Sequence, residues 1–188
     1  MPDAPDPTSV KSDLSISMVR ANLLAIYFIL PVMVLAAIYI VFWDFNNTST
    51  ILASYKSKAN ILWIIAAFFA GIVVHELIHA IAWTYLADKK NGQIKFGINW
   101  KTLTPYVHCN EPMNITAYRW GAAAPGIILG FIPYLIGLFF GNPVIAIYGL
   151  FFCFSASGDA LILWILRKVD KGKMVEDHPT NAGCYVIE

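Results

Sequence analysis

Four long stretches of the chain are almost purely apolar, and shorter polar segments separate them. They cover about residues 21–43, 60–86, 120–140 and 144–166. An α-helix needs about 20 apolar residues to cross the hydrocarbon core of a bilayer, which is roughly 30 Å thick. Each stretch meets that length. The pattern therefore predicts an all-α membrane protein with four transmembrane helices.

The segment between the second and third apolar stretches has a different pattern. Residues 93–100 alternate apolar and polar positions, and residues 102–109 are rich in β-branched and aromatic side chains. Alternation with a period of two is typical of β-strands. We therefore predict a short β-hairpin between the second and third helices, over 93–109. The polar residues 44–50 predict a turn between the first two helices.

Polar segments at both ends complete the predicted organisation. Residues 1–20 form a polar N-terminal segment, residues 21–166 form one four-helix membrane domain, and residues 167–188 form a polar tail. Eleven of the thirteen Lys and Arg residues lie in the two ends and in the loop 87–119, and the other two are Lys56 and Lys58. Because Lys and Arg concentrate in cytoplasmic segments, both termini are predicted to be cytoplasmic.

The bulk composition supports a membrane location. The 188 residues are 58% hydrophobic and 13% charged, with a mean hydropathy of +0.61. Soluble domains carry about 25% charged residues. The composition therefore indicates an integral protein of the cell membrane, with the lipid bilayer as its main partner. The net charge of +1, without a basic stripe, excludes nucleic acid as a partner.

The second apolar stretch contains the pattern H-E-x-x-H, formed by His75, Glu76 and His79. Residues four apart lie on one face of a helix, so both histidines can bind one metal ion. A glutamate one position after the first histidine can act as general base towards a water molecule. This spacing indicates a zinc site inside a membrane helix.

One acidic residue in another apolar stretch is a candidate third ligand. Glu76 and Asp159 are the only acidic residues within the four stretches, and no Lys or Arg lies there. A charge at the bilayer centre costs about 2.5–3.5 kcal/mol on insertion scales, so such a residue is a functional candidate. With about 1.5 Å per residue, His75, His79 and Asp159 reach similar depths, roughly 20–25 Å from the outer surface. Three protein ligands and one open position are typical of catalytic zinc.

Other interpretations of these residues stay open from the sequence. The histidines and Asp159 could form a buried polar network without metal, or a cation or proton relay in a small transporter. The predicted hairpin could clamp an extended substrate through its edge or simply cover the site. His108 is a candidate hydrogen-bond donor to a transition state, as are Tyr106 and Asn110. His108, Cys109, His178 and Cys184 are candidates for a second metal site, although their spacing matches no standard zinc pattern.

Residues 71–185 resemble the bacterial and archaeal membrane family described as "putative zincin peptidase", and the H-E-x-x-H helix resembles the intramembrane site-2 protease class. The resemblance implies that His75, His79 and Asp159 bind Zn²⁺ and that Glu76 is the catalytic base. It also implies an intramembrane endopeptidase that hydrolyses peptide bonds of membrane-embedded or juxtamembrane substrates, with water activated by zinc and Glu76. An inactive metal-binding relative that binds membrane partners is the alternative. The matching residues are His75–Ala80, Phe96-Gly97, Leu103–Pro112, Ala124–Gly130, Gly158-Asp159 and Asp177–Pro179.

The chain departs from the better-known site-2 proteases in two respects. Its aspartate lies in Ser157-Gly158-Asp159-Ala160, where those proteases have an Asp-Gly pair. The 188 residues also leave no room for a PDZ module. The resemblance therefore concerns the metal site and its helices rather than the recognition of a particular substrate.

Overall fold

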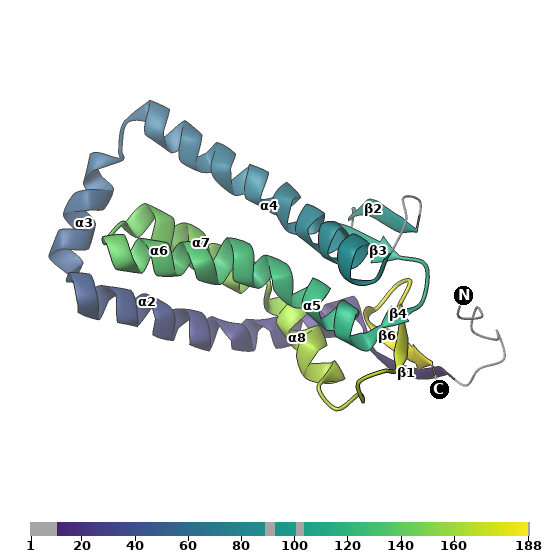
Figure 1. Cartoon of the computed structure of the whole chain (residues 1–188). Helices are drawn as coiled ribbons and strands as arrows, with labels where there is room; N and C mark the ends of the chain where they lie inside the picture. Colours follow the sequence, from purple (N-terminus) through teal and green to yellow (C-terminus); the bar gives the residue numbers. More distant parts are fainter. Residues whose placement is uncertain (1–10, 89–92, 101–103, 188) are drawn as a thin grey trace.

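A computed structural model describes residues 11–88, 93–100 and 104–187 of the chain (Figure 1). Most of these residues are helical, and two small antiparallel sheets lie together at one end of the long helices. The prediction of a mainly helical protein with membrane-length helices is confirmed. The four-stranded sheet is the main feature that the sequence pattern did not predict.

Among the described residues, three helical stretches are long and apolar enough to cross a membrane. Their mean hydropathies over an 18-residue window are 2.7, 2.3 and 2.0. Many of their apolar side chains are exposed, which suits lipid contact because lipid tails are as apolar as the side chains themselves. The first stretch joins α1 (Met18–Ala25), η1 (Ile26–Phe28) and α2 (Ile29–Trp43), the second is α4 (Lys58–Leu86), and the third joins α5 (Ile115–Pro125), the π-helix η2 (Gly126–Phe131) and α6 (Ile132–Phe140).

The fourth predicted helix, 144–166, consists of two helices. They are α7 (Pro143–Ser155) and α8 (Ser157–Leu166), which meet at an angle of 44°. Ala156 lies at the break between them. The break places residue 159 in the first turn of α8 rather than in the middle of a straight helix.

The predicted turn at 44–50 was wrong, because a helix begins there. Helix α3 (Phe45–Ser54) joins α2 to α4 at the end of the molecule opposite the sheets (Figure 1). Asp44 caps it, since the carboxylate accepts a hydrogen bond of 2.9 Å from the Asn46 backbone N–H. A capping side chain of this kind satisfies one of the free N–H groups at a helix start, so the polar residues here begin a helix.

Strands β2 (Ile94–Asn99) and β3 (Thr104–Cys109) come between α4 and α5 in the sequence and pair antiparallel. Their register pairs Lys95 with His108 and Gly97 with Tyr106. The Asn110 N–H also donates to the Gln93 carbonyl, so even-numbered residues of β3 direct their backbone groups to β2. Odd-numbered residues, including Pro105 and Val107, direct theirs away from β2.

The polar ends of the chain form a second sheet, which the sequence did not predict. Its strand order is β1-β6-β5-β4, with all neighbours antiparallel. The register of β1 pairs Lys11 with Ile187 and Ile16 with Ala182. Because β6 lies between β1 and β5, the last strand holds the first one in place. The strands are β1 (Lys11–Ile16), β4 (Met113–Asn114), β5 (Met174–Asp177) and β6 (Ala182–Ile187).

A hydrophobic core joins this sheet to the helices. It combines α4, β3, α5, α8 and both C-terminal strands. At its edge Arg119 donates hydrogen bonds to the carbonyls of Leu166 and Val169, which satisfies free acceptors at the end of α8. The core residues are Trp83, Cys109, Met113, Ile115, Tyr118, Leu166, Val175, Cys184 and Val186.

Small residues bring the third and fourth helical stretches together. A Cβ on Gly137 would lie 2.4 Å from the Ala146 backbone nitrogen, and one on Gly149 would lie 2.3 Å from that of Tyr134. Contacts this short exclude any side chain, so these positions set the distance between α6 and α7. The close packing fixes the position of α7 relative to α6. Because α8 begins directly after the break at Ala156, its first turn is held in place as well.

Candidate metal centre

Two histidines of α4 lie on one face of the helix and point into the protein. His75 and His79 are 7% and 6% exposed, and their ring centroids are 5.0 Å apart. The spacing of four residues produces this arrangement, because it brings side chains one turn apart onto the same face. Gly71, one turn earlier, leaves room for Phe152 of α7, since a Cβ there would meet that ring at 2.3 Å.

Asp159 approaches both histidines from α8. Its Oδ2 lies 3.2 Å from His75 Nε2, and its Oδ1 lies 3.4 Å from His79 Nε2. One ligand atom from each of the three residues lies within 4.8 Å of the other two. The structure therefore brings together the three residues that the motif and the depth comparison selected, from helices 84 positions apart in the chain.

The chemistry of these three groups fits a bound cation. His79 Nδ1 lies 2.9 Å from the Gly121 carbonyl oxygen, and a carbonyl only accepts, so Nδ1 carries the proton. In the neutral ring Nε2 then presents a lone pair towards a carboxylate oxygen that also only accepts. A positive charge between them removes this conflict. A hydrogen bond from the other ring nitrogen is the usual way in which proteins orient a metal-binding histidine.

His75 supplies a second observation in the same direction. Its Nδ1 is buried and has no hydrogen-bond partner among the described residues. Its Nε2 faces Asp159 and the shared space, so the nitrogen placed to bind a cation is defined here by geometry, without the orienting hydrogen bond that His79 has. Two imidazoles and one carboxylate are the ligand types of catalytic zinc sites with an open fourth position.

Glu76 lies beside the three ligands without belonging to the group. Its side chain is half-buried, and its carboxylate accepts a hydrogen bond from the backbone of Val107 in β3. Val107 is one of the residues that direct their backbone away from β2. The hairpin thus holds the carboxylate next to the metal ligands, where a general base is needed.

Two residues of the site were missed by the sequence analysis. Gly121 accepts the His79 hydrogen bond through its carbonyl, and a Cβ on it would lie 2.1 Å from Trp83 Nε1. Trp83 lies one turn after His79, and their rings stack with centroids 5.7 Å apart. A glycine followed by three alanines gives no signal of such a role. Trp83, four residues after His79, could have been found from its spacing.

A large cavity opens onto these groups. Its volume is about 790 Å³. Helix α1, strand β3 and the loop between β5 and β6 line it together with α4 and α8. The polar ends of the chain, which form the second sheet, therefore contribute walls to the site. Its polar lining includes His75, Glu76, His79, His108, Asp159, Asp177 and His178.

His108 and Asp177 form a separate pair in this cavity. His108 Nδ1 lies 2.7 Å from Asp177 Oδ2, and the Tyr118 hydroxyl donates to Asp177 Oδ1 at 2.9 Å. The hydrogen bond that His108 donates to Asp177 raises the pKa of His108 above its ordinary value of 6.5, and burial opposes this rise. In the described ranges, the group of His75, His79 and Asp159 is the only gathering of three potential metal ligands. The described residues therefore give no support to a second metal site formed by His108, Cys109, His178 and Cys184.

Comparison with curated proteins found no match, and comparison with solved structures found none either. A family model does match, over residues 68–174. This range covers more than half of the chain, and it includes the H-E-x-x-H helix, the β2–β3 hairpin and Asp159. The chain belongs to the family described as "Putative zincin peptidase".

Proposed function

We propose that this protein is an intramembrane zinc metallopeptidase of the site-2 protease class, acting on membrane-embedded or juxtamembrane peptide bonds. The observation that carries the proposal is the gathering of His75, His79 and Asp159 on two apolar helices, with Glu76 beside them. Family membership supports zinc and peptide hydrolysis. The apolar helices support a location within the bilayer.

His75, His79 and Asp159 would hold the metal, and zinc supplies a Lewis acid that polarises the scissile carbonyl and makes water more acidic. Glu76 takes a proton from the attacking water and delivers it to the leaving nitrogen. Val107 orients Glu76 through its backbone, and Gly121 orients His79. The second proton of the water also passes to the amine, so the products are a carboxylate and an ammonium group, and Glu76 returns to its ionised form.

The topology of the proposal follows the charges of the loops. Three spans and the bent pair α7–α8 cross the membrane, with both termini in the cytoplasm, because Lys and Arg concentrate on that side. The two sheets lie at one end of the long helices, and the first and last described strands, β1 and β6, belong to one of them (Figure 1). Residues of β3 and of the β5–β6 loop line the cavity. Water then reaches the site from the cytoplasm by a short path.

The substrate enters as an extended segment. A peptide bond inside a helix is shielded by its own hydrogen bonds, so the segment must unwind before hydrolysis. The edge of β3 that faces away from β2 offers the carbonyl oxygens of Pro105 and Val107 to such a segment. Pairing of an extended peptide with an exposed strand edge is a common mode of recognition.

Zinc analysis of the purified protein in detergent tests the proposal. We expect about one zinc per chain in wild type and Glu76→Gln, and loss of zinc in His79→Ala and Asp159→Ala. Glu76→Gln should lose the 10²- to 10⁴-fold contribution that general base catalysis makes. Glu111→Gln, which alters an exposed carboxylate beyond β3, is the matched control and should keep zinc and activity. Absence of zinc from wild type, or hydrolysis by Glu76→Gln at the wild-type rate, would overturn the proposal.

A further inference from the structure

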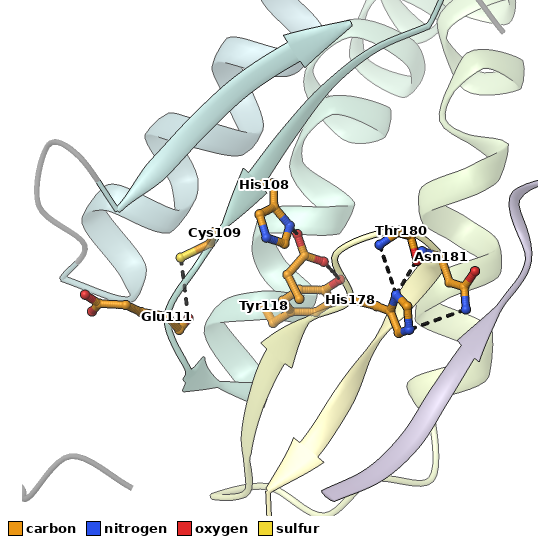
Figure 2. Close-up of polar contacts among 8 residues, drawn as sticks. His108, Cys109, Glu111, Tyr118, His178, Thr180 and Asn181 are labelled. Atoms are coloured by element: carbon orange, nitrogen blue, oxygen red, sulfur yellow. Dashed lines mark hydrogen bonds and ion pairs between the residues drawn. The ribbon is translucent and has the colours of Figure 1, made fainter. Parts of the chain in front are cut away.

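The chain places a polar network in the metal cavity that the proposed chemistry does not use. It consists of His108 in β3, Asp177 at the end of β5 and Tyr118 in α5. Figure 2 shows His108 and Tyr118 close together between β3 and the C-terminal strands. All three residues line the same cavity as the metal ligands. Buried carboxylate–imidazole pairs are costly unless each group is satisfied, so the function of this one needs an explanation.

The hydrogen bonds determine which nitrogen of His108 is available. Nδ1 donates to Asp177 Oδ2, and the Tyr118 hydroxyl donates to the other carboxylate oxygen, Oδ1. Nε2 makes no hydrogen bond to any residue that the structure describes, and the side chain is 20% exposed in a position that lines the cavity. With Nδ1 donating to the carboxylate, Nε2 carries an N–H only in the protonated ring, and that N–H is a donor directed at whatever fills the cavity.

A continuous chain of contacts fixes His108 relative to the metal ligands. The His79 ring stacks on Trp83, and Trp83 stacks on Tyr118, each pair with centroids 5.7 Å apart. Tyr118 then holds Asp177, which holds His108. In addition, His108 follows Val107, whose backbone contacts Glu76, and one residue of a strand spans only about 3.4 Å. The donor therefore lies in β3, one residue from the backbone group that contacts the base.

We propose that His108 is a catalytic residue that donates a hydrogen bond from Nε2 to the scissile carbonyl oxygen as this oxygen becomes negative, and that Asp177 positions its ring. This inference rests on the proposed hydrolysis. When water adds to the carbonyl carbon, the C=O electron pair moves to oxygen, and the His108 donor stabilises that charge. The C–N bond then breaks, and the leaving nitrogen receives its proton from Glu76. His108 keeps its own proton throughout.

The hydrogen bond and most of the charges around His108 favour its protonated ring. The hydrogen bond to Asp177 raises its pKa, and the carboxylates of Asp177 and Glu176 in β5 act in the same direction. Burial lowers the pKa, and so does Lys95, which pairs with His108 across the hairpin. The other ionisable groups that line the cavity are His75, Glu76 and His79 from α4, Tyr106 from β3, Tyr118 from α5, Asp159 from α8, and His178.

A probe of tetrahedral geometry tests the donor without knowledge of the substrate. N-phosphoryl-leucyl-tryptophan places anionic oxygens where the hydrolysis intermediate would carry its charge. We would measure its dissociation constant with zinc-loaded protein in detergent, for wild type, His108→Ala, His108→Gln, Asp177→Asn and Lys95→Ala. Zinc content and thermal unfolding of each variant would show that it is folded and loaded. An NMR titration of the His108 ring in metal-free protein would follow its protonation independently of activity.

Loss of one such donor lowers kcat by about 10²- to 10³-fold. We therefore expect His108→Ala to bind the probe 10²- to 10³-fold more weakly with unchanged zinc content, and His108→Gln, which keeps an N–H donor, to recover part of the loss. The alkaline limit of binding should move to lower pH in Asp177→Asn and to higher pH in Lys95→Ala. Wild-type affinity in folded His108→Ala would overturn this inference alone. Failure of zinc-loaded wild type to bind the probe would overturn the proposed function and this inference with it.

Discussion

Replacement of Gly121 by alanine should damage the metal centre more than the fold. The new Cβ would lie 2.1 Å from Trp83 Nε1 and 2.3 Å from its Cδ1. Real Cβ atoms do not approach other atoms so closely, so the indole must move. Trp83 is 5% exposed and stacks on both His79 and Tyr118. Its displacement therefore shifts the His79 ring away from the Gly121 carbonyl, its hydrogen-bond partner.

The magnitude follows from two separate effects. Overpacking of a core costs about 1–3 kcal/mol, and alanine recovers about 1 kcal/mol over glycine in a helix. The free energy of unfolding should then fall by no more than about 2 kcal/mol. Loss of the hydrogen bond that orients a metal-binding histidine typically costs 10- to 100-fold in metal affinity, which is about 1.4–2.8 kcal/mol. Zinc affinity should therefore report the change at least as strongly as stability does.

Competition between the protein and a chromogenic zinc chelator measures the affinity, and thermal unfolding in the same detergent measures stability. Gly158→Ala is the matched control, because it changes a glycine next to Asp159 where an added Cβ meets no atom within 4 Å. We expect it to keep wild-type zinc affinity. If Gly121→Ala also bound zinc with wild-type affinity, the assignment of Gly121 and Trp83 to the orientation of His79 would be refuted.

Three further predictions concern other parts of the molecule. Gly141→Ala should lower the free energy of unfolding by about 1–2 kcal/mol because alanine is strained in a left-handed backbone conformation. The loss should be larger because the new Cβ would lie 2.9 Å from the Trp43 ring. Gly172→Ala, with φ +97° and no atom within 4 Å of its Cβ, measures the backbone cost alone in the same unfolding assay. Cys109 and Cys184 should resist a water-soluble maleimide at pH 7.5 until the protein is unfolded, since both are fully buried and burial raises the pKa of Cys184 to about 12; rapid labelling detected by mass spectrometry would contradict their burial. Because Asp177 raises the pKa of His108 in the folded protein, the pair stabilises the fold below about pH 6.5, the ordinary value, and loses this contribution as pH rises through the raised pKa. Wild type should thus lose more thermal stability than Asp177→Asn between pH 6 and pH 9, and equal losses would show that the pair makes no such contribution.

The sequence was sufficient to select three candidate metal ligands that lie together in the structure, and the reason is physical. A helix has a fixed period and a fixed rise, so the spacing of His75 and His79 determines a shared face. The scarcity of charge in the apolar stretches then singled out Asp159. Depth matching worked although the fourth stretch is bent by 44°, because α7 is packed tightly against α6 and the break lies only three residues before Asp159.

The parts that could not be predicted depend on contacts between distant segments. His108 and Asp177 are 69 positions apart, and the strands that carry the ends of the chain are separated by most of the sequence. Short polar strands have weak local preferences, and their pairing depends on what lies next to them. Helix α3 was missed for a different reason, since Asn, Ser and Thr are as common in turns as at the start of a helix.

The position of β6 has a consequence for the order in which the protein assembles. Strand β1 is the first described element to leave the ribosome, yet its partner is β6, which emerges about 170 residues later. The loop before β6 lines the metal cavity. During synthesis the helices can therefore enter the membrane while the cavity still lacks one wall and Asp177. The nascent chain would hold its metal ligands before it held a complete site, so hydrolysis would begin only after the C-terminal strands had folded into place.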